Sequence, residues 1–287
     1  MFAKFGPAGT GDDFKAKGFK SSLQVPEYLV NMGLDHFEYQ CGRGVNIGLD
    51  KAAELGKIAA ENGITISLHA PYYISMSSVE EEKRLKSIDY ILQSARLANQ
   101  TGATRVVLHT GSCSKITRDH ALSLAIDTMK QALSVLKNEN LDHIFICPET
   151  MGKINQLGSL DEVLELCKLS EQLIPTIDFG HLNARTNGSL KCENDFAALF
   201  DKMEEVLGFD RTKVFHSHFS KIEYTAKGGE VRHLTFEDHL YGPEFEPLAN
   251  QIIKRNYCPT IICESAGTQC RDALKMREIY NFLYKAQ

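Results

Sequence analysis

Short apolar, β-branched runs alternate with amphipathic helical patterns along almost the whole chain, and this alternation limits the possible folds more than any other feature. Strands that alternate with helices pair in parallel through right-handed crossovers, because each helix returns the chain to the same end of the sheet. About eight such units in 287 residues are typical of one closed barrel. The sequence therefore predicts an α/β fold, a single (β/α)₈ TIM barrel domain formed by residues 1–287.

The expected strands and helices follow from period and from turn signals. The strands are expected at 4–8, 35–41, 66–71, 106–111, 144–150, 175–181, 214–220 and 260–267. The helices are expected at 49–63, 78–102, 120–140, 159–169, 195–208, 243–256 and 271–285. Ser78 with Glu81 and Ser159 with Glu162 are expected to form capping boxes, because a Ser followed three residues later by a Glu can satisfy the free N–H groups of a helix start.

Polar side chains stand at the downstream ends of six successive strands. Such groups are costly inside a sheet unless they share a task. In chain order they are His69, His109, Glu149, Asp178, His181, His216 or His218, and Glu264. Because the carboxyl ends of all barrel strands open on one face, these side chains are expected to converge there. The sequence therefore predicts a shared metal site at the C-terminal ends of the strands.

The ligand types narrow the choice of metal. Imidazole nitrogens and carboxylate oxygens, without paired thiolates, suit Zn²⁺, Mn²⁺ or Fe²⁺ better than Ca²⁺ or Mg²⁺. The set is larger than one tetrahedral ion needs, so two or three ions are expected, with Glu149 placed to bridge. Ions about 3.5–4 Å apart are the usual apparatus for displacement at phosphorus, where one generates hydroxide and another stabilises the leaving oxygen.

Composition excludes several other classes of protein. The net charge of −5 argues against a strongly basic nucleic-acid surface, although local basic loops remain compatible with it. The eight cysteines form no CxxC pair, which disfavours a zinc finger or a thioredoxin-like site. No run approaches the roughly 18 apolar residues of a membrane helix, and the N-terminus lacks a signal-peptide core. A cytoplasmic protein with no membrane anchor and no implied protein partner is expected.

An ordered set of short motifs adds a resemblance to a known family. The motifs are HxxY (69–72), LHTGS (108–112), ETMGKINQLG (149–158), TIDFGH (176–181), HFSK (218–221) and ICES (262–265). This ordered set resembles the endonuclease IV family of apurinic/apyrimidinic endonucleases, and the resemblance covers the chain from about residue 33 to residue 267. The resemblance implies a (β/α)₈ barrel with three zinc ions. It also implies that zinc-bound hydroxide cleaves DNA on the 5′ side of abasic sites, a step of base excision repair.

Carried over position by position, the resemblance implies a role for individual residues. The implied ligands are His69, His109 and Glu149 for one ion, Glu149, Asp178, His218 and Glu264 for the second, and His181 and His233 for the third. Glu149 and Glu264 are the residues expected to carry catalysis. Tyr72 and Arg43 are expected to contact the DNA substrate. His216 is expected to share a face with His218 and to lie just below the metals.

The chain departs from the family pattern in three places. The first strand reads FGPAG, without the family's His, and the loop GRGVNIG lacks the family's DNA-contacting Gln and Trp. The usual Asp-x-His of the third ion is replaced by Glu230-Val231-Arg232-His233. Either Glu230 substitutes across a shift of one residue, or Val231 leaves the ligand missing. A competing alignment places the ligand at His239.

Other residues and functions stay open. Several basic residues are expected near the catalytic rim, where they would grip phosphates; they are Lys115, Arg118, Lys153, Arg185 and Lys221. The main alternative function is a sugar isomerase or epimerase of the xylose isomerase-like barrels, and a non-catalytic metal-binding barrel is a third. The number of histidines favours the nuclease, whereas the altered DNA-facing loops favour the isomerase. Near three ions, measured by elemental analysis, would support the nuclease; one or two, especially Mn²⁺, would support the isomerase.

Overall fold

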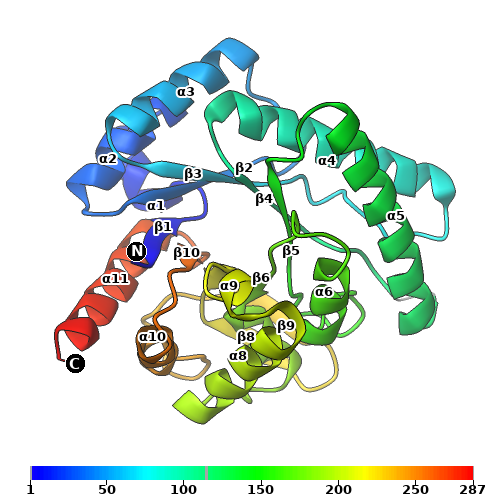
Figure 1. The fold of residues 1–287 in the computed structure, drawn as a ribbon. Coiled ribbons are helices and arrows are strands. Elements are labelled where there is room, and N and C mark those ends of the chain that lie inside the picture. The colour runs from blue at the N-terminus through cyan, green and yellow to red at the C-terminus, as the bar shows by residue number, and fades with distance from the viewer. Residues whose placement is uncertain (1, 114–115, 287) are drawn as a thin grey trace.

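Eight parallel strands surround a central axis and the helices lie outside them (Figure 1). The computed structural model describes residues 2–113 and 116–286, so Lys115 of the predicted basic rim lies outside the described residues. The barrel strands are β1 (Lys4–Pro7), β2 (His36–Gln40), β3 (Thr65–His69), β4 (Arg105–Leu108), β5 (Phe145–Pro148), β6 (Thr176–Asp178), β7 (His216–Phe219) and β10 (Thr260–Cys263). All eight predicted strands are therefore present, with shorter ends.

The strands close into a ring. They form two four-stranded parallel sheets, in the orders β2-β3-β4-β5 and β1-β10-β7-β6. Isolated parallel bridges join the two sheets on both sides, between Ala8 and Glu38 and between Glu149 and Thr176. The predicted (β/α)₈ TIM barrel is confirmed.

The helices cover the outside of this ring. They are α1 (Gly11–Ala16), α2 (Val25–Asn31), α3 (Leu49–Glu61), α4 (Glu81–Thr101), α5 (Arg118–Asn138), α6 (Leu160–Cys167), α7 (Phe179–Arg185), α8 (Glu193–Leu207), α9 (Phe209–Thr212), α10 (Phe245–Lys254) and α11 (Gln269–Lys285), with a short 3₁₀ turn, η1 (Ser22–Gln24). The seven predicted helices correspond to α3, α4, α5, α6, α8, α10 and α11. Within the described ranges, no helix is long and apolar enough to cross a lipid bilayer.

One predicted capping box is confirmed and the other is wrong. The hydroxyl of Ser159 accepts a hydrogen bond from the Glu162 N–H at 3.3 Å, and the Glu162 carboxylate accepts one from the Ser159 N–H at 2.8 Å. Helix α4 instead begins at Glu81 after the extended N-cap residue Glu80. The hydroxyl of Ser78 accepts from the Glu80 N–H at 3.2 Å, and so stabilises a turn before the helix.

The sixth strand ends earlier than predicted, because Asp178 caps an unpredicted helix. Its carboxylate accepts a hydrogen bond from the His181 N–H at 2.7 Å, which starts α7 directly at the end of β6. The predicted strand at 175–181 is therefore half strand and half helix. This turn brings Asp178 and His181 to the same end of the barrel from two different elements.

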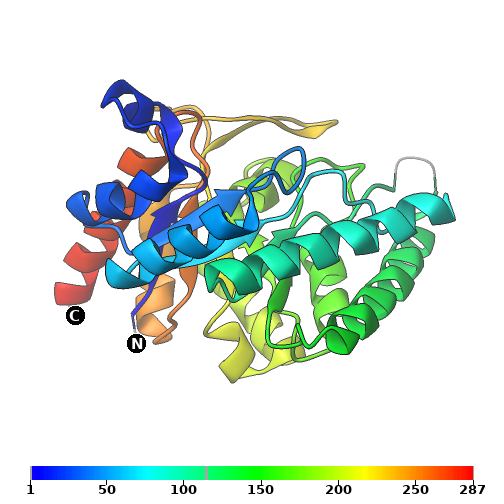
Figure 2. The same cartoon turned by 90° about the horizontal axis from the view of Figure 1, so that it is seen from above.

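A β-hairpin that the sequence reasoning did not predict follows β7. Strands β8 (Ile222–Thr225) and β9 (Gly229–His233) pair in antiparallel fashion, and the hairpin projects beyond the ring of strands (Figure 2). The register shifts inside it: Glu223 pairs with Arg232 but Tyr224 pairs with Glu230, so Val231 is an extra residue. Such a β-bulge redirects the side chains on either side of it.

The interior of the barrel is unusually polar on one side. Val107, Cys147 and Ile174 form a small apolar cluster, as expected for barrels filled by layers of apolar side chains. Five polar residues are also buried in the interior; they are His36, Glu38, Ser67, His216 and His218, each at most 3% exposed. This polar side leads directly to the ends of the strands.

Candidate metal centre

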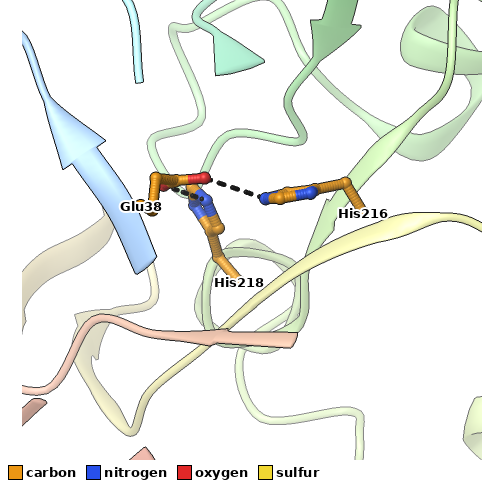
Figure 3. Close-up of side chains that lie close together, drawn as sticks. All are labelled: Glu38, His216 and His218. Atoms are coloured by element: carbon orange, nitrogen blue, oxygen red, sulfur yellow. Dashed lines mark hydrogen bonds and ion pairs between the residues drawn. The ribbon is translucent and has the colours of Figure 1, made fainter. Parts of the chain in front are cut away.

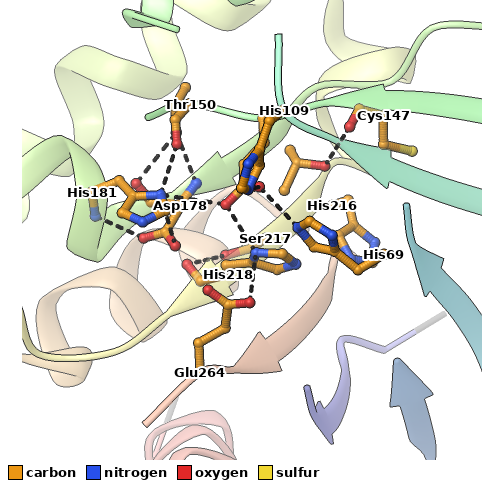
Figure 4. A network of polar contacts seen from close by, with 12 residues as sticks. His69, His109, Cys147, Thr150, Asp178, His181, His216, Ser217, His218 and Glu264 are labelled. Atoms are coloured by element: carbon orange, nitrogen blue, oxygen red, sulfur yellow. Dashed lines mark hydrogen bonds and ion pairs between the residues drawn. The ribbon is translucent and has the colours of Figure 1, made fainter. Parts of the chain in front are cut away.

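The carboxyl ends of the strands bring the predicted ligands together (Figure 4). Three groups of donor atoms lie within 4.8 Å of one another on this face; they are His69, Glu149 and His218, then Glu149, Asp178, His218 and Glu264, and finally His181, Glu230 and His233. His109 joins the first group through a 3.3 Å approach to Glu149. The second group contains the four residues that the resemblance implied, the first contains His218 in addition to His69 and Glu149, and the third contains Glu230 in addition to His181 and His233.

Glu149 lies at the centre of the cluster and is fully buried. Its Oε2 atom is 3.3 Å from Nε2 of His69 and 3.3 Å from Nε2 of His109. Its Oε1 atom is 3.1 Å from Nδ1 of His218 and 3.3 Å from Nδ1 of His181. One carboxylate thus faces four imidazoles from different elements, an arrangement suited to bridging two cations.

Four of the histidines each have one ring nitrogen beside a neighbouring oxygen, so that the other nitrogen is directed toward the carboxylates. The pairs are His69 Nδ1 with Ala70 O, His181 Nδ1 with Thr150 O, His218 Nε2 with Glu38 Oε1 and His233 Nδ1 with Ser220 Oγ, each at 2.9 Å. Three of these contacts are hydrogen bonds, and the approach of His218 to Glu38 is an ion pair. Contacts of this kind orient metal-binding imidazoles, because they favour one tautomer and one ring orientation. The histidines are therefore pre-oriented as nitrogen ligands.

A buried carboxylate oxygen without a hydrogen-bond partner indicates that the donor set suits a cation. Oδ2 of Asp178 is buried and accepts no hydrogen bond among the described residues, although Nδ1 of His181 lies 3.2 Å away. A buried acceptor without a partner is costly. Burial, together with the neighbouring Glu264 and Glu149 and against the opposing effect of His181, raises the pKa of Asp178. A divalent cation would compensate this oxygen and its charged neighbours.

The charges of the cluster are strongly coupled. Burial alone would raise the pKa of Glu149, but the facing His218, with His109 and His181, holds it well below its ordinary range. Burial alone would lower the pKa of His218, but Glu264, Glu38 and Glu149 raise it well above its ordinary value. The carboxylates therefore attract positive charge to the histidines. Cations that bind there have to displace protons from the imidazoles.

The third group brings Glu230 close to His181 and His233. Oε2 of Glu230 is 3.5 Å from Nε2 of His181, and Oε1 is 4.0 Å from Nε2 of His233. In a regular strand, residues three apart point to opposite faces, but the bulge at Val231 turns Glu230 and His233 to the same side. His239 is exposed and lies outside these groups.

The predicted DNA-contacting residues meet on the loops after β2 and β3. Nε of Arg43 donates a hydrogen bond to the Tyr72 hydroxyl at 3.0 Å, and the Tyr72 ring lies 4.8 Å from that of Tyr73. Both tyrosines are about half exposed. They offer a solvent-facing aromatic pair beside a cation.

Three of the predicted basic rim residues are engaged inside the protein. Arg118 pairs with Glu162, and Arg185 donates to backbone carbonyls of the loop after β5. Lys221 is 3% exposed and pairs with Glu244 at 2.7 Å. Their contacts hold loops in place, so the expectation that these three grip phosphates finds no support in the geometry.

Sequence reasoning missed Glu38, which lies in the middle of β2 and is fully buried. Its Oε1 and Oε2 atoms lie 2.9 Å from Nε2 of His218 and of His216, respectively. The alternation of the run HFEYQ held a signal, because it places Glu38 and the neighbouring His36 on one face of the strand. His216 lies below the cluster, as expected.

Comparisons with known proteins agree with this geometry. Residues 26–286 match the family of xylose isomerase-like TIM barrels. An uncharacterized protein of Methanocaldococcus jannaschii is 32% identical over 96% of this chain and 95% of its own length. A protein of Shouchella clausii named probable endonuclease 4 is 26% identical over 76% of each chain. A crystal structure of a D-tagatose 3-epimerase-like protein is similar with a TM-score of 0.72 and 20% identity, over 99% of this chain and 98% of that one.

The epimerase-like structure shows the shared fold alone, whereas the curated endonuclease relative confirms the resemblance read from the ordered motifs. The chain belongs to the xylose isomerase-like TIM barrel family.

Proposed function

We propose that this protein is a metal-dependent phosphodiesterase that uses two or three zinc ions to cleave DNA on the 5′ side of abasic sites. The observation that carries the proposal is the orientation of the histidines. Each of four imidazoles has one nitrogen beside an oxygen at 2.9 Å and directs the other toward a carboxylate. The likeness to probable endonuclease 4 supports the choice of substrate.

The residues would divide into three ligand sets. Glu149 would be shared by the first two, His69 and His109 would complete one, and Asp178, His218 and Glu264 would complete the other. His181, Glu230 and His233 would form the third. Zinc ions at these positions supply Lewis acids that activate water near neutral pH and stabilise a leaving oxygen.

The protein itself supplies position and charge. The burial of Glu149 and Asp178 excludes water from their carboxylates, so their negative charges would act strongly on the cations that hold and polarise a phosphodiester. Tyr72 and Arg43, beside the centre, would contact the sugar–phosphate chain next to the abasic site.

A nicking assay tests this function. Protein stripped of metal with a chelator and reloaded with Zn²⁺ is expected to cut a duplex with a synthetic abasic site and to leave a 3′-hydroxyl, while an undamaged duplex stays intact. Cleavage is expected to weaken as salt rises, because phosphate contacts release counterions. The salt slope is expected to be shallow, because Arg118, Arg185 and Lys221 are engaged inside the protein.

One observation favours a small substrate instead. A pocket of about 280 Å³ lies beside the centre, lined by Ala8, Gln40, His233, Glu264 and Gln269. That volume is close to the lower end of small-molecule sites, roughly 300 Å³. The alternative is therefore a sugar isomerase or epimerase. Failure to nick abasic DNA with Zn²⁺ or Mn²⁺, together with interconversion of a ketose and its epimer, would replace the nuclease with this alternative.

A further inference from the structure

Glu38 faces four donors, two of which, on His216 and His218, are shown in Figure 3. Its Oε1 atom lies 2.9 Å from Nε2 of His218 and accepts a hydrogen bond from the Gln40 amide at 3.2 Å. Its Oε2 atom accepts from the Ser67 hydroxyl at 2.8 Å and lies 2.9 Å from Nε2 of His216. An ionised carboxylate has about four acceptor positions, so this one is saturated.

The carboxylate is itself held from below. The Ser67 hydroxyl lies 2.9 Å from Nε2 of His36, and Nδ1 of His36 lies 2.7 Å from the Thr65 hydroxyl. This column of polar groups runs through the barrel from the metal centre toward the opposite end. Because Glu38, Ser67 and His36 are buried, Glu38 has little freedom to turn away from His218.

We propose that Glu38 is a positioning residue for the metal centre: its carboxylate pairs with Nε2 of His218, so that Nδ1 of this ring is presented to the ion that His218 would share with Glu149 and Glu264. Nδ1 of His218 lies 3.1 Å from Glu149 and 3.5 Å from Glu264, on the side of the ring away from Glu38. A carboxylate behind a ligand histidine also makes the imidazole a stronger donor. The proposal rests on the proposed metal centre and not on which substrate is cleaved.

Glu38, His216 and His218 also have the composition of a separate metal site. The geometry favours the positioning role. The four approaches to the carboxylate have hydrogen-bond lengths of 2.8–3.2 Å, and an ion would have to displace the Ser67 and Gln40 donors. All three side chains are fully buried, which leaves no open route to them.

Zinc affinity of Glu38→Gln tests the proposal directly. The variant keeps the size of the side chain but removes its charge, and competition with a chromogenic chelator measures the dissociation constants. The ion that His218 would hold is expected to bind about 10–100-fold more weakly, the typical cost of losing a group that holds a metal ligand. The number of ions bound at saturating zinc is expected to stay the same.

A spectroscopic readout separates this effect from a general loss of structure. Protein loaded with ¹¹³Cd is expected to give one resonance for each ion. Glu38→Gln should shift the resonance of the ion that His218 would hold and leave that of the ion at His181, Glu230 and His233 in place.

Two further variants keep the test decisive. Glu162→Gln is the matched control, because Glu162 is also a buried carboxylate in an ion pair, with Arg118, but contacts none of the candidate ligands. It is expected to leave zinc affinity unchanged. Ser67→Ala removes one donor and keeps the charge of Glu38, so it is expected to give a smaller weakening than Glu38→Gln and serves if that variant does not fold.

The outcomes are distinguishable. Unchanged zinc affinity in Glu38→Gln, alongside a large loss in His218→Ala, would overturn the positioning role and leave the metal centre intact. A loss of one whole ion, with the others bound as before, would also overturn it and would indicate a buried ion at Glu38. If neither variant changed zinc binding, the metal centre and the proposed function would fall together.

Discussion

The two halves of the candidate metal centre are built on different supports. Glu149, Asp178 and His218 stand at the ends of barrel strands, and their side chains are at most 1% exposed. Glu230 and His233 stand on the projecting hairpin, and their side chains are 14% and 25% exposed. The strand ends are fixed by neighbours on both sides, whereas the hairpin, among the described residues, pairs with no barrel strand and is held by contacts with α7 and with the loop after β5.

This difference shows which parts of a site a sequence reveals. In the barrel, register fixes the offset between strand and ligand, so the inner residues follow directly from their position in each run. On the hairpin, the bulge accommodates one extra residue. The spacing between the two candidate ligands is therefore longer by one residue, while their side chains still point to the same side. The inner set is therefore expected to tolerate substitution least and to bind its ions most tightly.

Replacing Glu149 should give the largest effect. Glu149→Gln keeps the shape but removes the charge that faces four imidazoles. Loss of a group that only holds a ligand costs about 10–100-fold in metal affinity, so loss of this bridging carboxylate is expected to cost more, with activity lost in parallel. Elemental analysis and the nicking assay measure both. Full metal content and full activity would refute the ligand assignment.

The hairpin half should lose a single ion. His233→Ala is expected to lower the ion count by about one and to leave the inner ions bound, because His233 contributes only to the third group. His239→Ala is the control and is expected to leave the count unchanged, since His239 is exposed and lies outside the groups. The reverse result would move the third site to the segment around His239.

A methyl group at residue 152 should displace the hairpin by crowding one of its side chains. A Cβ at Gly152 would lie 2.7 Å from Cβ of Glu230 and 2.9 Å from Cδ2 of His181, closer than side chains tolerate. Overpacking of this kind costs about 1–3 kcal/mol, so Gly152→Ala is expected to weaken the third ion by about 10-fold. Gly48→Ala, where the new methyl has nothing within 4 Å, is the control. Equal zinc affinities for the two variants would show that the hairpin moves aside for the methyl group without loss of zinc binding.

The smallest effect is expected at Ser220. Its hydroxyl lies 2.9 Å from Nδ1 of His233 and helps to direct Nε2 toward Glu230. Ser220→Ala removes this uncharged partner, so the third ion is expected to weaken by about 10-fold or less, the lower end for a group that orients a ligand. Zinc titration of the variant provides the measurement, and a loss as large as that of His233→Ala would mean that Ser220 has a wider role.

Much of the fold was accessible from local pattern. Each barrel strand and each long helix carries its own period, and Ser159 with Glu162 forms the predicted capping box. The failures have local causes. Ser78 supports a turn instead of a cap, and Asp178 ends its strand because it caps α7.

The site was accessible to the same extent. The candidate ligands at strand ends were predicted because parallel strands align their ends on one face. Glu38 was missed because it stands in mid-strand, where its partners come from β3 and β7, far away in the sequence. The role of Glu230 depends on a bulge that no local pattern specified.

The bulge at Val231 also affects how such chains are to be recognised. In a regular strand, an extra residue between two candidate ligands would turn them to opposite faces. Here the bulge compensates, since Glu230 points in the direction that a residue two before His233 would have. A signature with a fixed Asp-x-His spacing would count this chain as having lost the pair. Among relatives, a candidate third site is therefore better recognised by the direction of the two side chains on the hairpin than by the number of residues between those two side chains.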